Sequence, residues 1–188
     1  MHRTAALSSL LAALATAPLA AQHAGHTMAT ASERPTGQSR VDPRWLSWEA
    51  GTRTVRFELI GGAPGAKSPF NFNGFVDGEL TLVVPEGATV VMNFVNEDGV
   101  PHSAEIILDK DPMPNMAGDP AIPRAYTRKA IEGLNQGERD VMRFTAAPAG
   151  EYRIFCGVPG HGLSGMWIRL RVSASATEPS MVETPKQG

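Results

Sequence analysis

Residues 155–167 have the sequence Phe155-Cys156-Gly157-Val158-Pro159-Gly160-His161-Gly162-Leu163-Ser164-Gly165-Met166-Trp167. A thiol, an imidazole and a thioether recur in this stretch, five residues apart. Cys156 ends one predicted strand and Met166 begins the next. Because glycine and proline favour tight turns, the segment between them can fold its donor side chains round a single point. We therefore expect a strand, a loop and a strand that together carry a metal site.

The rest of the chain also shows a β pattern. Apolar residues alternate with polar ones from Thr54 to Ile60, which indicates a strand with one buried face. The predicted strands cover residues 54–60, 70–75, 79–84, 89–96, 102–108, 139–145, 150–156 and 166–173. Short strands separated by turn residues predict an all-β sandwich or barrel, and no helices alternate with them as a βαβ fold requires.

One segment, Asp109 to Glu138, interrupts this pattern. It contains four prolines, two methionines and little alternation. We expect one long loop insertion between two strands, with a short helix around Arg128 to Leu134. Loops of this length in a compact domain are usually functional or disordered.

The N-terminus predicts export. Residues 1–21 combine a basic start, a short apolar stretch and small residues, the pattern of a secretory signal peptide. Residues 22–44 lack apolar periodicity and predict a flexible leader. A single domain over 45–173 and a flexible tail over 174–188 are expected to follow. The mature protein is then periplasmic or secreted.

Composition narrows the class of protein further. The chain has 188 residues, 42% of them hydrophobic, and a formal net charge of −2. This size suits one ordinary domain, and no basic patch indicates binding to nucleic acid. After the signal, no segment is apolar for the roughly 20 residues that a membrane span needs. We expect a soluble monomer.

Cys156 is the only cysteine. Exported proteins usually use cysteines in pairs, so a single thiol in an oxidising compartment needs a reason. It can be an inert buried side chain, a nucleophile or a metal-bound thiolate. His161 and Met166 in the same loop favour the metal, because one Cys, two His and a weak axial Met form the ligand set of blue copper sites.

The second histidine is identified by elimination. His2 leaves with the signal, His23 and His26 lie in the leader, and His102 lies within the predicted domain after a turn. A rigid site of this kind suits fast one-electron exchange between Cu(I) and Cu(II). The predicted ligands of the single copper ion are His102, Cys156, His161 and Met166.

At this point the sequence resembles a known family. The motifs are the Cys-x4-His-x4-Met loop, Pro101-His102-Ser103, Phe70-Asn71-Phe72-Asn73-Gly74 and Val84-Pro85-Glu86-Gly87. They are similar to those of the cupredoxin superfamily, most closely its sulfocyanin branch, with rusticyanin as a second relative. The resemblance covers Trp45 to Ser173. It implies a Greek-key β-sandwich with copper under loops at one end, and single-electron transfer to redox partners such as a cytochrome or a terminal oxidase.

The resemblance also draws attention to residues around the four ligands. Ser103 follows the first histidine, where many cupredoxins have an asparagine that ties the two ligand loops together. An apolar collar that keeps water from the site is expected from Phe72, Asn73, Phe75, Pro159, Leu163 and Trp167.

The alternative function is a periplasmic copper chaperone or resistance protein. In that interpretation His23-x2-His26 and Met113-x2-Met116 bind copper loosely. An enzyme is not expected. A cysteine hydrolase needs a base and an orienting group beside Cys156, and a glycine-flanked cysteine at a strand end with a methionine nearby is not that arrangement. Multicopper oxidases need further His-x-His pairs, and the binuclear centre of an oxidase subunit needs a second cysteine in the loop. The sequence contains neither.

Overall fold

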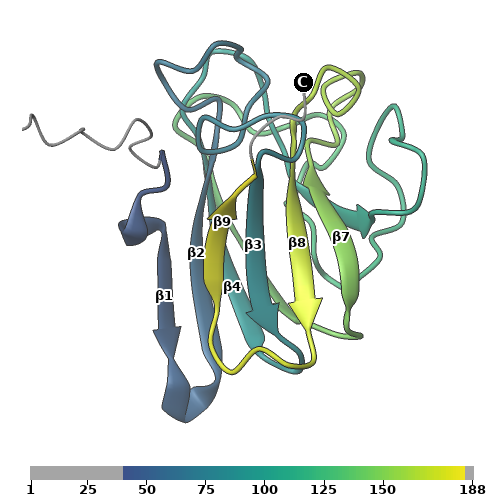
Figure 1. The fold of residues 1–188 in the computed structure, drawn as a ribbon. Helices are drawn as coiled ribbons and strands as arrows, with labels where there is room; N and C mark the ends of the chain where they lie inside the picture. Colours follow the sequence, from purple (N-terminus) through teal and green to yellow (C-terminus); the bar gives the residue numbers. More distant parts are fainter. Residues whose placement is uncertain (1–39, 185–188) are drawn as a thin grey trace, which may run out of the picture. The chain divides into compact units, whose positions relative to one another are not determined.

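The computed structural model describes residues 40–184, which form two β-sheets packed face to face (Figure 1). The first sheet contains, in spatial order, β1 (Leu46–Glu49), β2 (Thr54–Gly61), β4 (Thr89–Asn96) and β6 (Arg139–Thr145). The second contains β5 (Glu105–Leu108), β7 (Gly150–Phe155), β8 (Trp167–Ser173), β3 (Leu80–Pro85) and β9 (Ser180–Glu183). Two short 3-10 helices, η1 (Pro43–Trp45) and η2 (Ala50–Thr52), flank β1. The predicted signal peptide and residues 22–39 of the predicted leader lie outside the described residues.

Strand neighbours in each sheet are mostly distant in sequence. β2 pairs in parallel with β4, and β3 pairs in parallel with β8, while the remaining pairs are antiparallel. The chain therefore crosses repeatedly from one sheet to the other, and the predicted all-β sandwich is confirmed. Within residues 40–184, no helix has the length and apolar character that a transmembrane span requires.

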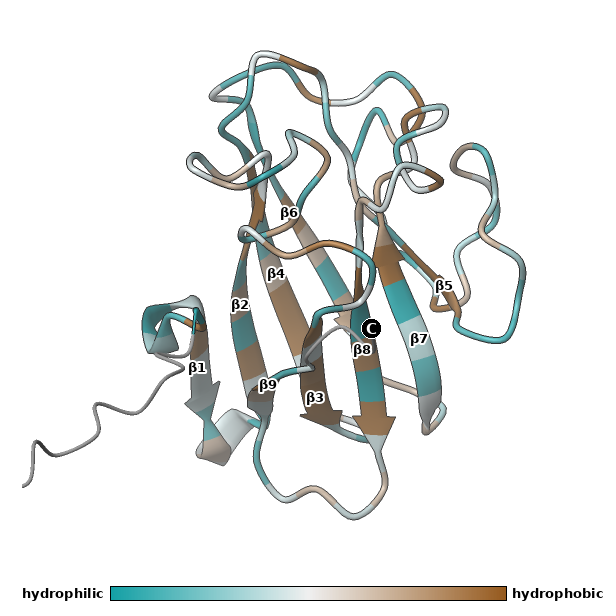
Figure 2. Ribbon diagram, turned by 45° about the horizontal axis from the view of Figure 1, so that its top comes forward, coloured by the Kyte–Doolittle hydropathy of each residue, from teal (hydrophilic) through white to brown (hydrophobic). Residues whose placement is uncertain are grey.

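The core lies between the two sheets. Along β2, Val55, Phe57 and Leu59 are fully buried because alternate side chains point inward. Figure 2 shows apolar residues along β3 and β4, which supply further core side chains. The same buried cluster includes Cys156 and Met166, so the end of the core merges with the predicted site.

The predicted strand over residues 70–75 is wrong. The segment forms only isolated bridges, because asparagine side chains take the place of strand partners. Asn71 Oδ1 accepts from the amides of Ala63 and Gly74, and Asn73 bonds to the β2 backbone through both side-chain atoms. Asn73 and Gly74 also have positive φ values of 53° and 83°, which end an extended strand.

Residues 102–108 form a strand only from Glu105 onward. His102 instead pairs with Leu134 in an isolated bridge. The predicted helix over residues 128–134 is absent from the described structure, and turns occupy this segment. Lys129 and Gly133 have φ values of 53° and 80°, and such left-handed residues interrupt a right-handed helix.

The predicted boundaries of the domain also need correction. The predicted tail contains β9, which pairs with β3, and Met181 in β9 packs against the core. The Arg40 guanidinium binds Glu183 with Nε 2.8 Å from Oε1, and Asp42 caps η1 by accepting from the Arg44 amide at 2.9 Å. The ordered domain thus begins before Trp45 and ends after Ser173. β9 was not predicted, because two apolar residues among polar neighbours make no clear alternation.

Candidate metal centre

The predicted ligand loop connects β7 to β8 at one end of the sandwich (Figure 1). Cys156 directly follows β7 and Met166 directly precedes β8. The Cys156 amide donates to the Met166 carbonyl at 3.0 Å, so the two residues continue the strand pairing. The Met166 amide donates to the His161 carbonyl at 3.1 Å, which folds the loop back on itself. Backbone hydrogen bonds therefore hold these three residues together.

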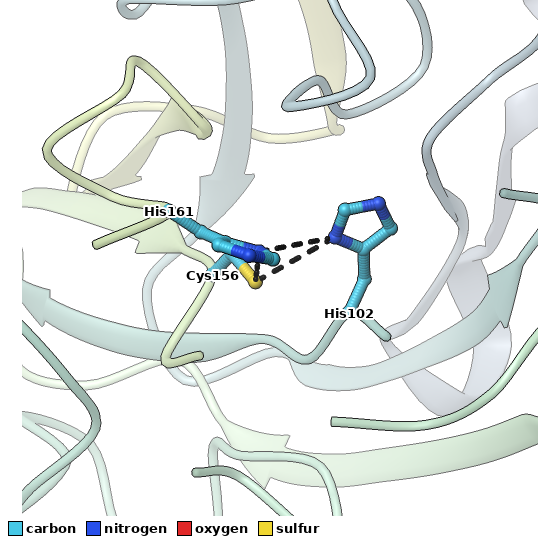
Figure 3. A group of neighbouring side chains, drawn as sticks. All are labelled: His102, Cys156 and His161. Carbon is cyan, nitrogen blue, oxygen red and sulfur yellow. Dashed lines mark hydrogen bonds between the residues drawn. The ribbon is translucent and has the colours of Figure 1, made fainter. Parts of the chain in front are cut away.

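His102 reaches the same place from the chain that follows β4. Figure 3 shows its ring facing Cys156 and His161. The two histidine Nδ1 atoms are 3.3 Å apart, and Cys156 Sγ is 3.4 Å from His161 Nδ1 and 4.0 Å from His102 Nδ1. A point equidistant from the three atoms lies about 2.1 Å from each, close to the roughly 2.0 to 2.3 Å of metal bonds to imidazole and thiolate. The three donors are thus spaced as the ligands of one metal ion.

Burial sets the protonation of the three donors. It lowers the pKa of His102 to about 4, with a smaller contribution from His161 in the same direction and an opposing one from Asp98. Burial lowers the pKa of His161 as well. Both rings are therefore neutral at pH 7 and have a lone pair for a metal. Burial raises the pKa of the Cys156 thiol, so a bound cation is needed to displace its proton.

Ser103 connects the two ligand-bearing segments. Its amide donates to Cys156 Sγ at 3.4 Å. Its hydroxyl donates to the Ala130 carbonyl at 2.7 Å and accepts from the Gly157 amide at 3.0 Å. One buried side chain therefore fixes the residue after His102, the residue after Cys156 and the long connection from β5 to β6.

The long connection over residues 109–138 packs directly on the site. Its residue Leu134 exchanges two backbone hydrogen bonds with His102, at 3.1 and 2.7 Å. The Ala117 amide donates to the Gly157 carbonyl at 2.8 Å, and the Asn115 carbonyl accepts from the Gly160 amide at 2.7 Å. The sequence predicted the length of this segment but not its position over both ligand-bearing loops.

The fourth predicted ligand, Met166, is fully buried in the cluster that contains Cys156. The backbone hydrogen bonds to Cys156 and His161 described above fix the position of its backbone beside both residues. A buried thioether in the same cluster as Cys156, together with one thiol and two imidazoles, matches the donor chemistry of a type 1 copper site. The residues present therefore fit a copper ion.

The apolar cover of the histidines differs from the predicted collar. The Phe70 ring lies 4.6 Å from the His161 ring and 6.5 Å from the His102 ring, measured between centroids. Phe72 and Phe75 belong to the core, and Leu163 is 60% exposed. Sequence analysis placed Phe70 in a predicted strand and left it out of the collar, because its contact with His161 depends on how two distant loops pack.

Comparisons with known proteins agree with this geometry. Residues 43–183 match the family described as "Sulfocyanin (SoxE) domain". The sulfocyanin of Sulfolobus acidocaldarius is 28% identical over 142 residues, which cover 72% of this chain and 71% of that protein.

Solved structures of rusticyanin have a similar fold. Crystal structures of rusticyanin variants align with a TM-score of 0.51 at 26% identity, covering 64% of this chain and 78% of theirs. Another rusticyanin structure aligns with a TM-score of 0.50 at 23% identity, covering 69% and 89%. The chain belongs to the sulfocyanin family of cupredoxins, which are copper proteins with a type 1 site and act as electron carriers rather than enzymes.

Proposed function

We propose that this chain is an exported blue copper protein that carries single electrons between exported or membrane-bound redox partners. The observation that carries this proposal is the convergence of three buried donor atoms, separated by 3.3, 3.4 and 4.0 Å, on one point. One thiolate and two imidazoles suit both oxidation states of copper. Bound copper supplies the one-electron Cu(I)/Cu(II) couple. The proposed ligands are His102, Cys156, His161 and Met166.

The protein contributes a site that moves little. Cys156 and Met166 are anchored by adjacent strands, and His102 is anchored by its paired bonds to Leu134. The Ser103 hydroxyl links these segments from the side. Because each donor is held by bonds that do not involve the metal, the donors can keep their places when the charge of the site changes by one.

Met166 is proposed as the weak axial ligand. Its backbone bonds to both Cys156 and His161, and its side chain is fully buried in the same cluster. A thioether binds Cu(II) weakly and is commonly the long axial contact in blue copper sites. Its role is therefore to adjust the reduction potential rather than to hold the metal in place.

An electron can leave by way of His161. This residue is 9% exposed, whereas His102 and Cys156 are fully buried. Leu163, two residues further along the loop, is 60% exposed. Met116 is 42% exposed and precedes Ala117, whose amide bonds to Gly157 in the ligand loop. Ile131 is 45% exposed and follows Ala130, whose carbonyl accepts from the Ser103 hydroxyl. These apolar side chains support brief docking of a redox protein, such as a cytochrome or a terminal oxidase, beside His161.

The proposal places the protein in the periplasm or outside the cell, as a monomer. Its support is the signal-like pattern of residues 1–21. The single cysteine adds to this, because a metal-bound and fully buried thiolate is protected from the oxidation that threatens a free thiol.

A copper chaperone has less support. His23 and His26 lie outside the described residues. Met113, in the long connection, packs against the ligand loop. Its Sδ lies 3.1 Å from the point where a Cβ built on Gly162 would stand. A chaperone must hand its copper to another protein, however, and two of the three converging donors are fully buried. The geometry favours retention of the metal.

Spectroscopy tests the proposal. Purified protein loaded with Cu(II) should show an intense thiolate-to-copper absorption band and the narrow hyperfine splitting of type 1 copper in electron paramagnetic resonance. Cys156→Ser should remove both. The double variant Met113→Leu with Met116→Leu should keep both, because it removes the alternative thioether donors and leaves His102, Cys156 and His161 in place. A colourless wild-type protein with ordinary tetragonal copper signals would contradict the assignment.

A further inference from the structure

The second ring nitrogen of His102, Nε2, is buried and has no hydrogen-bond partner. Among the side-chain nitrogens and oxygens of residues 40–184, it is the one buried atom in this condition. Figure 3 shows it on the side of the ring away from Cys156 and His161. A neutral imidazole that gives the Nδ1 lone pair to a metal carries its hydrogen on Nε2. Copper binding therefore fixes an N–H donor at a buried position that requires an acceptor.

Asp98 lies beside this nitrogen. A Cβ built on Gly62 would lie 3.1 Å from His102 Nε2, and 2.2 and 3.1 Å from Cβ and Cγ of Asp98. The bare face of Gly62 thus lies against both the imidazole and the Asp98 side chain. Gly62 also has a φ of 62°, a conformation that a larger residue rarely adopts. Two independent features therefore keep this position open.

The Asp98 side chain is held in place and has capacity for a further bond. Its amide donates to Asn96 Oδ1 at 2.9 Å, and its Oδ1 accepts from the Val100 amide at 2.7 Å. Its other carboxylate oxygen has no hydrogen-bond partner among the residues described. His102 Nε2 and Asp98 Cγ each lie 3.1 Å from the same point, the Cβ built on Gly62, so they are at most about 6.2 Å apart. The carboxylate is therefore within reach of this ring nitrogen, directly or across one water molecule.

We propose that Asp98 accepts the His102 Nε2–H in the copper-loaded protein, directly or across one water molecule. Asp98 is then a positioning residue, which fixes the tautomer and orientation of the His102 ring. A carboxylate partner makes a ligating imidazole a stronger donor, and the more highly charged Cu(II) gains more from this than Cu(I) does. Asp98 therefore lowers the reduction potential. This inference rests on the proposed role of His102 as a copper ligand.

Asp98→Asn tests the inference, with Glu97→Gln as the matched control. The asparagine keeps an oxygen for the Val100 amide but loses the charge and the second acceptor. Glu97 is an exposed neighbour, so its replacement removes the same charge without touching His102. Two quantities are measured in each protein. They are the reduction potential and, with isotope-labelled histidine in the Cu(I) form, the rate of solvent exchange of the His102 Nε2–H by nuclear magnetic resonance.

We expect Asp98→Asn to raise the potential, to speed the exchange of the Nε2–H, and to weaken Cu(II) binding by about 10- to 100-fold. Glu97→Gln should leave all three close to wild type. Blue proteins in which the two variants have the same potential and the same exchange rate would overturn the role of Asp98 alone. A wild-type protein without the intense absorption band would instead overturn the proposed function, whatever the Asp98 variant does.

Discussion

The hydroxyl of Ser103 accepts a hydrogen bond from the amide of Gly157 at 3.0 Å, and so links the residue after His102 to the residue after Cys156. The same hydroxyl donates to the Ala130 carbonyl at 2.7 Å. Ser103 is fully buried, so water cannot replace these bonds if the hydroxyl is removed. Three segments that are remote in sequence depend on this one oxygen atom.

Ser103→Ala should therefore lower the free energy of unfolding of the metal-free protein by about 1 to 3 kcal/mol, because a buried amide and a partly buried carbonyl lose their partner. Denaturant unfolding followed by circular dichroism measures this. Ser164→Ala is the control. The Ser164 hydroxyl donates to the Gly160 carbonyl at 2.9 Å in the same loop but is exposed, so its loss should change stability by less than about 0.5 kcal/mol. Equal losses in the two variants would show that Ser103 has no special structural role.

Replacing Met166 by leucine should raise the reduction potential and leave the blue colour largely intact. Leucine keeps the apolar volume but removes a weak donor that favours Cu(II), while the three strong donors remain. Protein film voltammetry and the visible spectrum check the two parts. Met142→Leu is the matched control, because Met142 is equally buried but lies on β6. A fall in potential for Met166→Leu would count against Met166 as the axial ligand.

The local part of the site could be predicted from sequence. Cys156, His161 and Met166 share one loop, so their spacing alone predicted a common site. His102 joined them by elimination, because few histidines were available. Phe70 could not be found in this way, since its contact with His161 depends on how two distant loops pack. Local pattern shows which side chains are present, whereas long-range packing decides which of them meet.

The fold, too, has parts that local pattern predicts and parts that depend on long-range packing. β2 was predicted well because buried residues alternate with more exposed ones along most of it. β4 was predicted well because most of its residues are buried. The predicted strand at 70–75 failed because the Asn71 and Asn73 side chains satisfy backbone groups that a strand partner would otherwise bind. β9 was missed because its stability comes from pairing with β3 and not from its own sequence. Tertiary contacts overrode local preference in both cases.

Gly157→Ala should destabilise the protein and weaken copper binding. A Cβ at this position would lie 2.5 Å from the Ala117 Cβ and 2.8 Å from the Ala130 carbonyl oxygen, so the long connection must shift. Overpacking of this kind typically lowers the free energy of unfolding by about 1 to 3 kcal/mol. Thermal unfolding and copper titration measure the two effects. Gly118→Ala is the control on the same connection, because nothing lies within 4 Å of its added Cβ. Equal behaviour of the two variants would mean that the contact with Gly157 is not tight.

The metal-free protein should lose stability as the pH falls from about 6.5 toward 4. Burial lowers the pKa of His102 from 6.5 to about 4 in the folded state, so over this range the unfolded chain binds a proton that the folded chain does not. Stability then rises with pH, and the group accounts for about 3 kcal/mol between the two limits. The raised pKa of the buried Glu105 acts in the opposite direction, so the wild-type slope alone does not isolate His102. The lowered pKa of His161 acts in the same direction as that of His102. Urea unfolding of the wild type and of His102→Gln at several pH values removes the Glu105 contribution, which is common to both proteins, and leaves the contribution of His102 together with its coupling to His161. Parallel curves for the two proteins would show that His102 titrates normally and that its ring is not held neutral by burial.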